Sequence, residues 1–141
     1  MTVMALDVGS KRIGIAVADP TATFALPVGT IERTNLRRDL ETVLEFAASY
    51  GAGEIVVGDP ISLTGERGVA AQKMDAFVEQ LARVFSGEIH RVDERLTTAQ
   101  ATKTLIAADV SRRKRRDVVD KMAAALILES FLARRGRDAR S

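Results

Sequence analysis

The sequence of 141 residues contains no cysteine, no tryptophan and a single histidine, His90. Without cysteine, the chain can form no disulfide, no thiolate metal site and no cysteine nucleophile. One histidine also argues strongly against a histidine-rich zinc site. Any metal site would therefore be built from oxygen ligands, which suit Mg²⁺ or Mn²⁺.

Aromatic side chains are scarce as well, with five phenylalanines and one tyrosine. This scarcity argues against a platform of exposed aromatics for stacking single-stranded nucleic acid. No apolar segment approaches the length needed to span a bilayer, and the first residues lack the pattern of a signal peptide. We therefore expect a cytoplasmic protein.

The charge is nearly balanced, with 21 basic and 19 acidic residues, but the basic residues are unevenly distributed. Five consecutive cations occupy 112–116, and the last residues are again basic. Such blocks favour a polyanionic partner, although a solvated loop and a disordered tail would also account for them. The length suits one domain, which we place at 1–135, with 136–141 as a basic tail that we expect to be disordered.

Hydrophobic patterns and turn residues predict an α/β protein with a mixed sheet and helices packed on its faces. Two consecutive apolar runs near the start read as a hairpin of strands buried on both sides. Pro27 marks the third strand as an edge strand. The predicted strands are 2–7, 12–18, 24–32, 54–58 and 88–92, and the predicted helices are 36–50, a helix ending near 85, 97–108 and 117–134.

Asp7 ends the first strand and is followed by a glycine turn at Gly9 and by Lys11 and Arg12. A carboxylate at that position either accepts backbone hydrogen bonds in the turn or holds a cation or moves a proton. The strand alone leaves both readings open.

Asp120 lies in an apolar helix, on the same helical face as Ala124, Ile127 and Phe131. A buried carboxylate costs several kcal/mol unless it is paired or bound to a cation. A buried ion pair with lysine or arginine is the alternative, although the adjacent Lys121 points about 100° away on a helix.

Asp93 and Glu94 follow the fifth strand, where they face opposite sides if the strand continues. The alternation alone does not say which of them faces Asp7, and a charged turn is the simpler alternative for the pair. Together with Asp7 and Asp120, one of them would complete an anionic cage made only of oxygen. Such a cage suits two divalent cations, which can hydrolyse a phosphodiester. The candidate phosphate-binding cations are Lys11, Arg12, Arg95, Arg112, Arg113, Lys114 and Arg115.

Four segments together resemble the motifs of the YqgF family of Holliday-junction-resolvase-like nucleases, now associated with processing of pre-16S rRNA. They are Ala-Leu-Asp-Val-Gly-Ser-Lys-Arg-Ile-Gly-Ile-Ala-Val (5–17), Ile-Val-Val-Gly-Asp-Pro (55–60), Val-Asp-Glu-Arg-Leu-Thr-Thr (92–98) and Val-Asp-Lys-Met-Ala-Ala-Ala-Leu-Ile-Leu (119–128). They occur in the family's order and cover about 3–132.

The resemblance implies a ribonuclease H-like fold with a five-stranded mixed sheet, in which the second strand runs antiparallel to the others. It implies a metal-binding catalytic trio of Asp7, Glu94 and Asp120, so it favours Glu94 over Asp93. Asp59 and Asp117 depart from the family pattern, and we expect both to add negative charge near the nucleic-acid face.

The leading hypothesis is an endonuclease that uses two ions of Mg²⁺ or Mn²⁺ to process the 5′ end of pre-16S rRNA. The choice of RNA as the substrate comes from the resemblance, whereas the residues themselves support only phosphodiester hydrolysis. One alternative is a dimeric resolvase of four-way DNA junctions, and another is a ribosome-assembly factor that binds nucleic acid without cleaving it. A nucleotide-binding protein of the actin and sugar-kinase type is a further alternative. Such proteins need two domains around the nucleotide, and this reading leaves the three acids unexplained. The expected partners are structured RNA or branched DNA and the ribosome, with the protein a monomer or homodimer.

Overall fold

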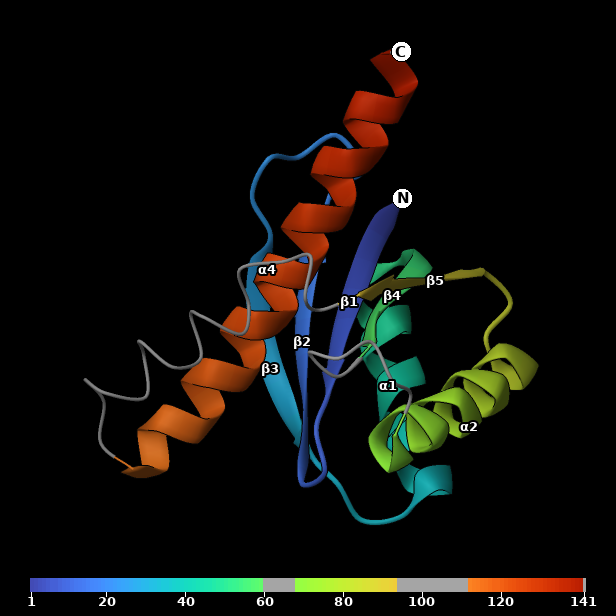
Figure 1. Ribbon diagram of the computed structural model, residues 1–141, viewed down its shortest axis with the longest axis vertical. Coiled ribbons are helices and arrows are strands. Elements are labelled where there is room, and N and C mark those ends of the chain that lie inside the picture. Colours follow the sequence, from blue (N-terminus) through green and yellow to red (C-terminus); the bar gives the residue numbers. More distant parts are fainter. Residues whose placement is uncertain (60–67, 94–111, 141) are drawn as a thin grey trace.

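The computed structural model describes residues 1–59, 68–93 and 112–140, and for 70, 112–120 and 137–140 it describes only the backbone. Five strands and three helices lie in these ranges (Figure 1). In chain order they are β1 (Thr2–Val8), β2 (Arg12–Ala18), β3 (Leu26–Glu32), α1 (Leu36–Tyr50), β4 (Ala52–Asp59), α2 (Val69–Val84), β5 (Glu88–Asp93) and α4 (Arg112–Arg140).

The strands form one mixed sheet in the order β3-β2-β1-β4-β5. β2 pairs antiparallel with β1 and β3, whereas β1 and β5 pair parallel with β4. The predicted five-stranded sheet with an antiparallel second strand is therefore confirmed. So is the edge position of the strand that contains Pro27, since proline removes one ladder hydrogen bond and is tolerated best at an edge.

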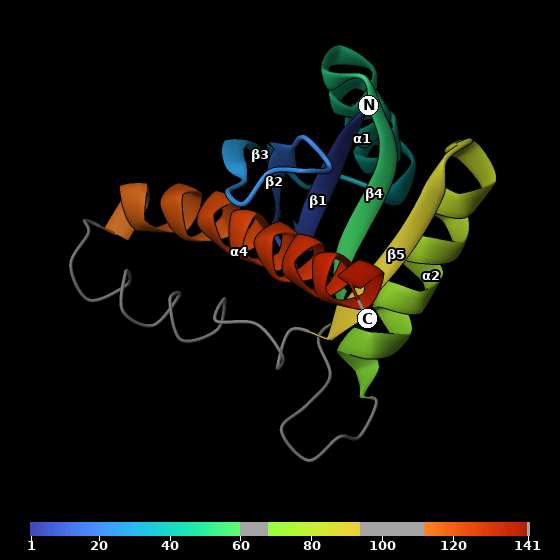
Figure 2. The ribbon, with the colours of Figure 1, turned by 90° about the horizontal axis from the view of Figure 1, so that it is seen from above.

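The two faces of the sheet are covered by different helices, α1 and α2 on one face and α4 on the other (Figure 2). β1 contributes to both layers, because its side chains alternate between them. Met4 and Leu6 pack with residues of α1 and α2 in the larger core cluster. Val3 and Ala5 pack with Ala123, Ile127 and Leu128 of α4 in the second cluster.

Small side chains line the contact between the sheet and α4. On the sheet they are Ala5, Ala16 and Ala18, and on the helix they are Ala123, Ala124 and Ala125, all of them buried. Ala16 packs directly with Ala124 and Ala125. Because these residues have short side chains, the helix backbone approaches the sheet closely.

Local sequence signals placed most boundaries to within about two residues, and α1 begins and ends where predicted. The last helix is the exception, because it begins at Arg112 and not near 117. The basic run is thus the start of α4, since arginine and lysine are good helix formers and no helix breaker separates them from the apolar segment. The helix also continues to Arg140, so the predicted tail falls on its end. The predicted helix at 97–108 lies outside the described residues, and no helix within them is long and apolar enough to cross a membrane.

Candidate active site

Asp7 lies one residue before the carboxyl end of β1 and is only 6% exposed. It follows Val3 and Ala5 at intervals of two, so its side chain belongs to the face of the sheet that α4 covers. Its antiparallel partner on β2 is Gly14, which places no side chain beside the carboxylate. The strand therefore holds an acid in the layer between the sheet and α4.

The helix brings Asp120 toward the same end of the molecule. Ala124 packs on Ala16 of β2, and Ala16 is two residues along that strand from Gly14, the partner of Asp7. α4 runs roughly opposite to β1 (Figure 1). Asp120 is four residues, or about one turn, before Ala124. Its backbone is therefore displaced from the Ala16 contact in the direction of Asp7.

The end of β5 resolves the ambiguity that alternation left open for Asp93. Val92 belongs to the cluster that packs on α4, so Asp93 belongs to the opposite face, the one that α2 covers. Arg91 shares this face, and its guanidinium contacts Asp75 of α2 at 2.8 Å. Asp93 thus faces away from Asp7. Glu94 and Arg95 lie outside the described residues.

Asp59 lies on this α2 face as well, next to Asp93 in the parallel register of β4 and β5. It is 7% exposed, and its Oδ1 lies 3.1 Å from the guanidinium of Arg91. The expected addition of negative charge at the surface is therefore not found at Asp59, because its carboxylate is buried on the α2 face and paired with Arg91. For Asp117 the structure describes only the backbone, within α4.

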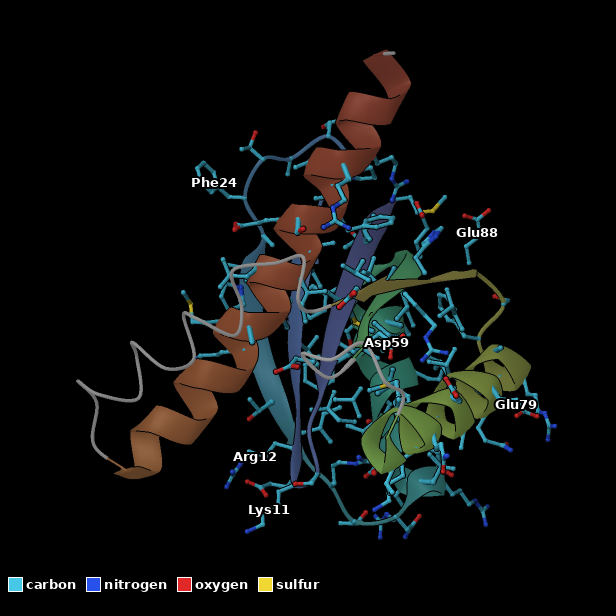
Figure 3. All side chains as sticks on the ribbon, in the orientation of Figure 1. Lys11, Arg12, Phe24, Asp59, Glu79 and Glu88 are labelled. Carbon is cyan, nitrogen blue, oxygen red and sulfur yellow. The ribbon has the colours of Figure 1, made fainter. Side chains whose placement is uncertain are left out.

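The turn between β1 and β2 carries Lys11 and Arg12 at the outer end of the sheet (Figure 3). Lys11 is exposed, whereas the Nε of Arg12 donates to Glu32 on β3 at 2.9 Å. The backbone N–H of Gly9 donates to the carbonyl of Arg12 at 2.8 Å. A Cβ at Gly9 would stand 3.0 Å from that carbonyl, so the turn favours glycine there.

Arg33, which the sequence gave no reason to single out, ties this turn to α1. Its guanidinium donates to the carbonyl of Gly9 at 2.8 Å and to Asp39 at 3.1 Å, and Asp39 is buried. The backbone N–H of Arg33 donates to the carbonyl of Lys11. The turn next to Asp7 is therefore held from two sides.

The predicted phosphate-binding run, Arg112 to Arg115, forms the first turn of α4, and the structure describes only its backbone. This end of the helix projects beyond the β3 edge of the sheet (Figures 1 and 2). The run and the β1–β2 turn are therefore carried by different elements, and only the turn adjoins Asp7 in the chain.

A second polar group lies where β4 and β5 begin, at the end of these strands away from the carboxyl edge. We call it the Glu54 cluster, and it consists of Glu54, Glu88, His90, Phe131 and Arg135. Arg135 donates two hydrogen bonds of 3.1 Å to the two carboxylate oxygens of Glu54. His90 Nε2 lies 2.8 Å from Glu54, and both His90 and Arg135 lie against the ring of Phe131.

The hydrogen bonds from Arg135 and then His90 hold the pKa of Glu54 below its usual value, against the opposing effect of burial. Ligand atoms of Glu54, Glu88 and His90 lie within 4.8 Å of one another and could in principle hold a metal ion. Arg135 already engages both oxygens of Glu54, however, and the group is separate from Asp7. The described geometry therefore supports a link between α4 and the sheet.

Comparison with known proteins agrees with this architecture. The profile of the family described as "RuvX: Holliday junction resolvase" matches residues 1–134. A protein of Moorella thermoacetica named "Putative pre-16S rRNA nuclease" is 43% identical, over 98% of this chain and 99% of its own length. A protein of the same name from Thermoanaerobacter pseudethanolicus is 44% identical, over 94% of this chain and 96% of its own.

Solved structures of resolvases share the fold at low sequence identity. RuvC of T. thermophilus, in complex with a Holliday junction, superposes with a TM-score of 0.60 at 14% identity, covering 96% of each chain. The Fowlpox virus resolvase gives a TM-score of 0.53 at 11% identity, covering 94% of this chain and 99% of its own. These similarities confirm the predicted ribonuclease H-like fold. With a family match over nearly the whole chain and relatives above 40% identity, the protein belongs to the RuvX family.

Proposed function

We propose that the protein is a metal-dependent endonuclease that hydrolyses phosphodiester bonds in precursor 16S rRNA, in the cytoplasm. The observation that carries the proposal is the position of Asp7. It is buried at the carboxyl end of the central strand, on the face covered by α4. In α4, the backbone of Asp120 lies one turn from the contact of Ala124 with Ala16, on the side of Asp7. The burial of Asp7 and the backbone position of Asp120 support a shared site for these two acids from distant parts of the chain.

In this proposal Asp7, Glu94 and Asp120 hold the divalent ions. The donor set fits Mg²⁺ or Mn²⁺, because it contributes carboxylate oxygens alone, and the single histidine is engaged in the Glu54 cluster. Bound divalent ions activate water and stabilise the leaving oxygen of a phosphodiester. The face of Asp93 supports Glu94 as the third ligand, since the residue after Asp93 returns to the α4 face if the strand continues.

Basic residues position the RNA backbone around this end of the sheet. Lys11 is exposed on the turn that follows Asp7 and binds a phosphate next to the cleaved bond. Arg12 contributes less charge, because Glu32 already pairs with it. Arg95 and the run Arg112, Arg113, Lys114 and Arg115 extend the contact to phosphates farther away.

RNA is favoured over branched DNA by the relatives that share more than 40% of their residues, which are named for pre-16S rRNA. The resolvases share only the fold at 14% and 11% identity. The family description nevertheless keeps junction cleavage as a second candidate function. That reaction requires two symmetrically placed active sites and hence a dimer.

The test compares wild type, Asp7→Asn and Asp93→Asn on a 5′-extended 16S rRNA precursor and on a four-way DNA junction. Each is assayed with Mg²⁺, with Mn²⁺ and with chelator. We expect Asp7→Asn to lose more cleavage than the roughly 10–100-fold typical of an outer-shell partner, while still binding RNA. Asp93→Asn is the matched control, because it removes the same charge on the opposite face.

Absence of metal-dependent cleavage of both substrates would overturn the enzymatic proposal. Retention of full function in Asp7→Asn would favour the non-catalytic assembly factor. Cleavage of the junction alone, by a protein that is dimeric in a sizing experiment, would favour the resolvase.

A further inference from the structure

A pocket of about 520 Å³ lies on the face of the sheet opposite Asp7, between the β1–β2 turn and the two helices of that face. Its volume falls within the range of roughly 300–1,000 Å³ typical of small-molecule sites. Val8, Gly9 and Ser10 line it from the turn, Arg33 and Leu36 from the start of α1, and Val69, Lys73 and Phe77 from α2.

The described lining combines apolar surface with positive charge and includes no acidic residue. Leu36 and Val69 are two of the large apolar side chains that remain exposed, at 37% and 68%. They are also the first residues of α1 and α2. Both helices therefore direct the positive ends of their dipoles to the pocket, where Lys73 adds a full positive charge. A ligand with an apolar body and an anionic group matches this lining.

Arg33 gives the pocket a flat, fixed surface. Its guanidinium is held by Gly9 and by buried Asp39, and it lies 5.8 Å from the ring centroid of Phe77. Phe77 is 2% exposed, so the ring backs the guanidinium and does not itself face solvent. The Arg33 side chain keeps 26% of its exposure. Nucleic-acid bases stack on arginine planes as they do on aromatic rings, so the scarcity of exposed aromatics does not exclude one base here.

The pocket and the proposed active site lie on opposite faces of the same strand end, the carboxyl end of β1. Val8 lines the pocket and packs toward the α1 and α2 core, whereas Asp7, the residue before it, faces α4. The turn that lines the pocket with Gly9 and Ser10 continues into Lys11, the proposed phosphate contact. A strand bound at Lys11 can therefore place a neighbouring base over the other side of the turn.

We propose that this pocket binds one unpaired nucleotide of the RNA substrate next to the cleaved phosphate, with the base against Arg33 and Leu36 and its phosphate near Lys73. The proposal rests on the nuclease function proposed above and adds a requirement for single-stranded character beside the cut. It follows the general mode of RNA recognition, in which splayed bases of unpaired segments are stacked and read.

The first experiment uses the absence of tryptophan from the chain. Val69→Trp places a single tryptophan at the exposed mouth of the pocket. Without divalent ions, this variant is titrated with a single-stranded oligoribonucleotide, with an abasic ribose-phosphate chain of equal length, and with AMP. We expect the tryptophan emission to change with the oligoribonucleotide, to stay constant with the abasic chain, and to require much higher concentrations of AMP.

The second experiment fills the pocket from an exposed position, which avoids disturbing the core. Ala76 is exposed on α2 and lines the pocket, whereas Ala82 is exposed on α2 outside the lining. Measured by filter binding, Ala76→Leu should weaken oligoribonucleotide binding by about 5- to 150-fold, the range for losing one stacked base. Ala82→Leu should bind like wild type, and neither variant should change binding of the abasic chain.

Equal emission changes with the abasic chain would overturn the proposal, because the contact would then be to the backbone. So would equal affinities of Ala76→Leu and Ala82→Leu, or an AMP signal that the oligoribonucleotide fails to displace. These measurements need no cleavage, so they are independent of the Asp7→Asn assay. Cleavage without a fluorescence response would refute the pocket alone, and a response without cleavage would refute the nuclease alone.

Discussion

Replacing Glu54 with glutamine removes a negative charge that joins β4 to the far half of α4. Glu54 accepts two hydrogen bonds from Arg135 at 3.1 Å and lies 2.8 Å from His90. Its side chain is 14% exposed, and that of Arg135 is 40% exposed. The substitution keeps the size of the side chain and one acceptor oxygen, so the loss of charge is the principal perturbation.

The expected cost follows from this geometry. Hydrogen bonds to charged groups contribute about 1.5–3 kcal/mol, and the partial exposure of Arg135 reduces that contribution through solvent screening. We therefore expect Glu54→Gln to lower the free energy of unfolding by about 1–2 kcal/mol at neutral pH. For a chain of this size the melting temperature should fall by about 3–6 °C.

The sign of the pH dependence follows from the lowered pKa of Glu54, caused first by the hydrogen bonds from Arg135. A carboxyl whose folded pKa lies below its unfolded value stabilises the protein above the unfolded pKa. The contribution is lost as the pH falls through the folded pKa. The difference between wild type and Glu54→Gln should therefore be full above the ordinary value of 4.5 and should shrink as the pH drops below it.

Urea unfolding of both proteins, followed by circular dichroism between pH 3 and pH 8, measures this difference directly. Glu88→Gln is the matched control, since Glu88 is 76% exposed and lies 3.3 Å from His90. An exposed pair of that kind should contribute less than about 1 kcal/mol. If Glu54→Gln were as stable as wild type at pH 7, or if the difference persisted unchanged at pH 3, Glu54 would not join α4 to the sheet in the way described.

Three further outcomes are expected. Ala124→Leu should destabilise the protein by about 1–3 kcal/mol through overpacking against the sheet, measured by urea unfolding. It should also reduce the cleavage rate of the protein that remains folded. Gly51→Ala should cost about 1 kcal/mol in thermal unfolding, because Gly51 ends α1 in the left-handed region at φ 64°. Lys11→Gln should reduce the salt dependence of RNA binding by about 0.7 in the slope of log K against log salt, and Arg12→Gln by less, because Glu32 already pairs with Arg12. Equal slopes for these two variants would contradict the assignment of Lys11.

The elements that the sequence predicted well are those whose signals are local. α1 was located at both ends because Asn35 caps its start, accepting from the backbone N–H of Arg38, and Gly51 ends it in the left-handed conformation. The β1–β2 hairpin followed from two apolar runs around a glycine turn. The start of α4 could not be located in this way, because its basic residues favour a helix as much as the apolar segment that follows.

The parts of the site that the sequence left open depend on contacts between distant segments. Which face Asp93 occupies becomes decidable only when α4 is known to cover the Val92 side of β5. The burial and pairing of Asp59 were missed for the same reason, since nothing near it in the sequence identifies Arg91 as its partner. The pairing of Glu54 with Arg135, 81 residues later, has no local signal at all. The assignments of Glu94, Arg95 and the side chain of Asp120 stay predictions.

The position of Asp120 relative to Asp7 is set by packing along the whole of α4. Near the acids, the contact of Ala16 with Ala124 fixes how closely the helix approaches the sheet. Farther along α4, the hydrogen bonds from Arg135 to Glu54 fix the direction of the helix axis. Arg135 lies about 22 Å from Asp120 along that axis. A tilt of only about 3° about that point moves Asp120 by about 1 Å, and a misplacement of that size can cost about 100-fold in rate. Glu54→Gln should therefore lower kcat of the folded protein more than its affinity for RNA, although Glu54 lies far from the cleaved bond. A variant with unchanged kcat would show that the Ala16 contact alone is sufficient to position the helix.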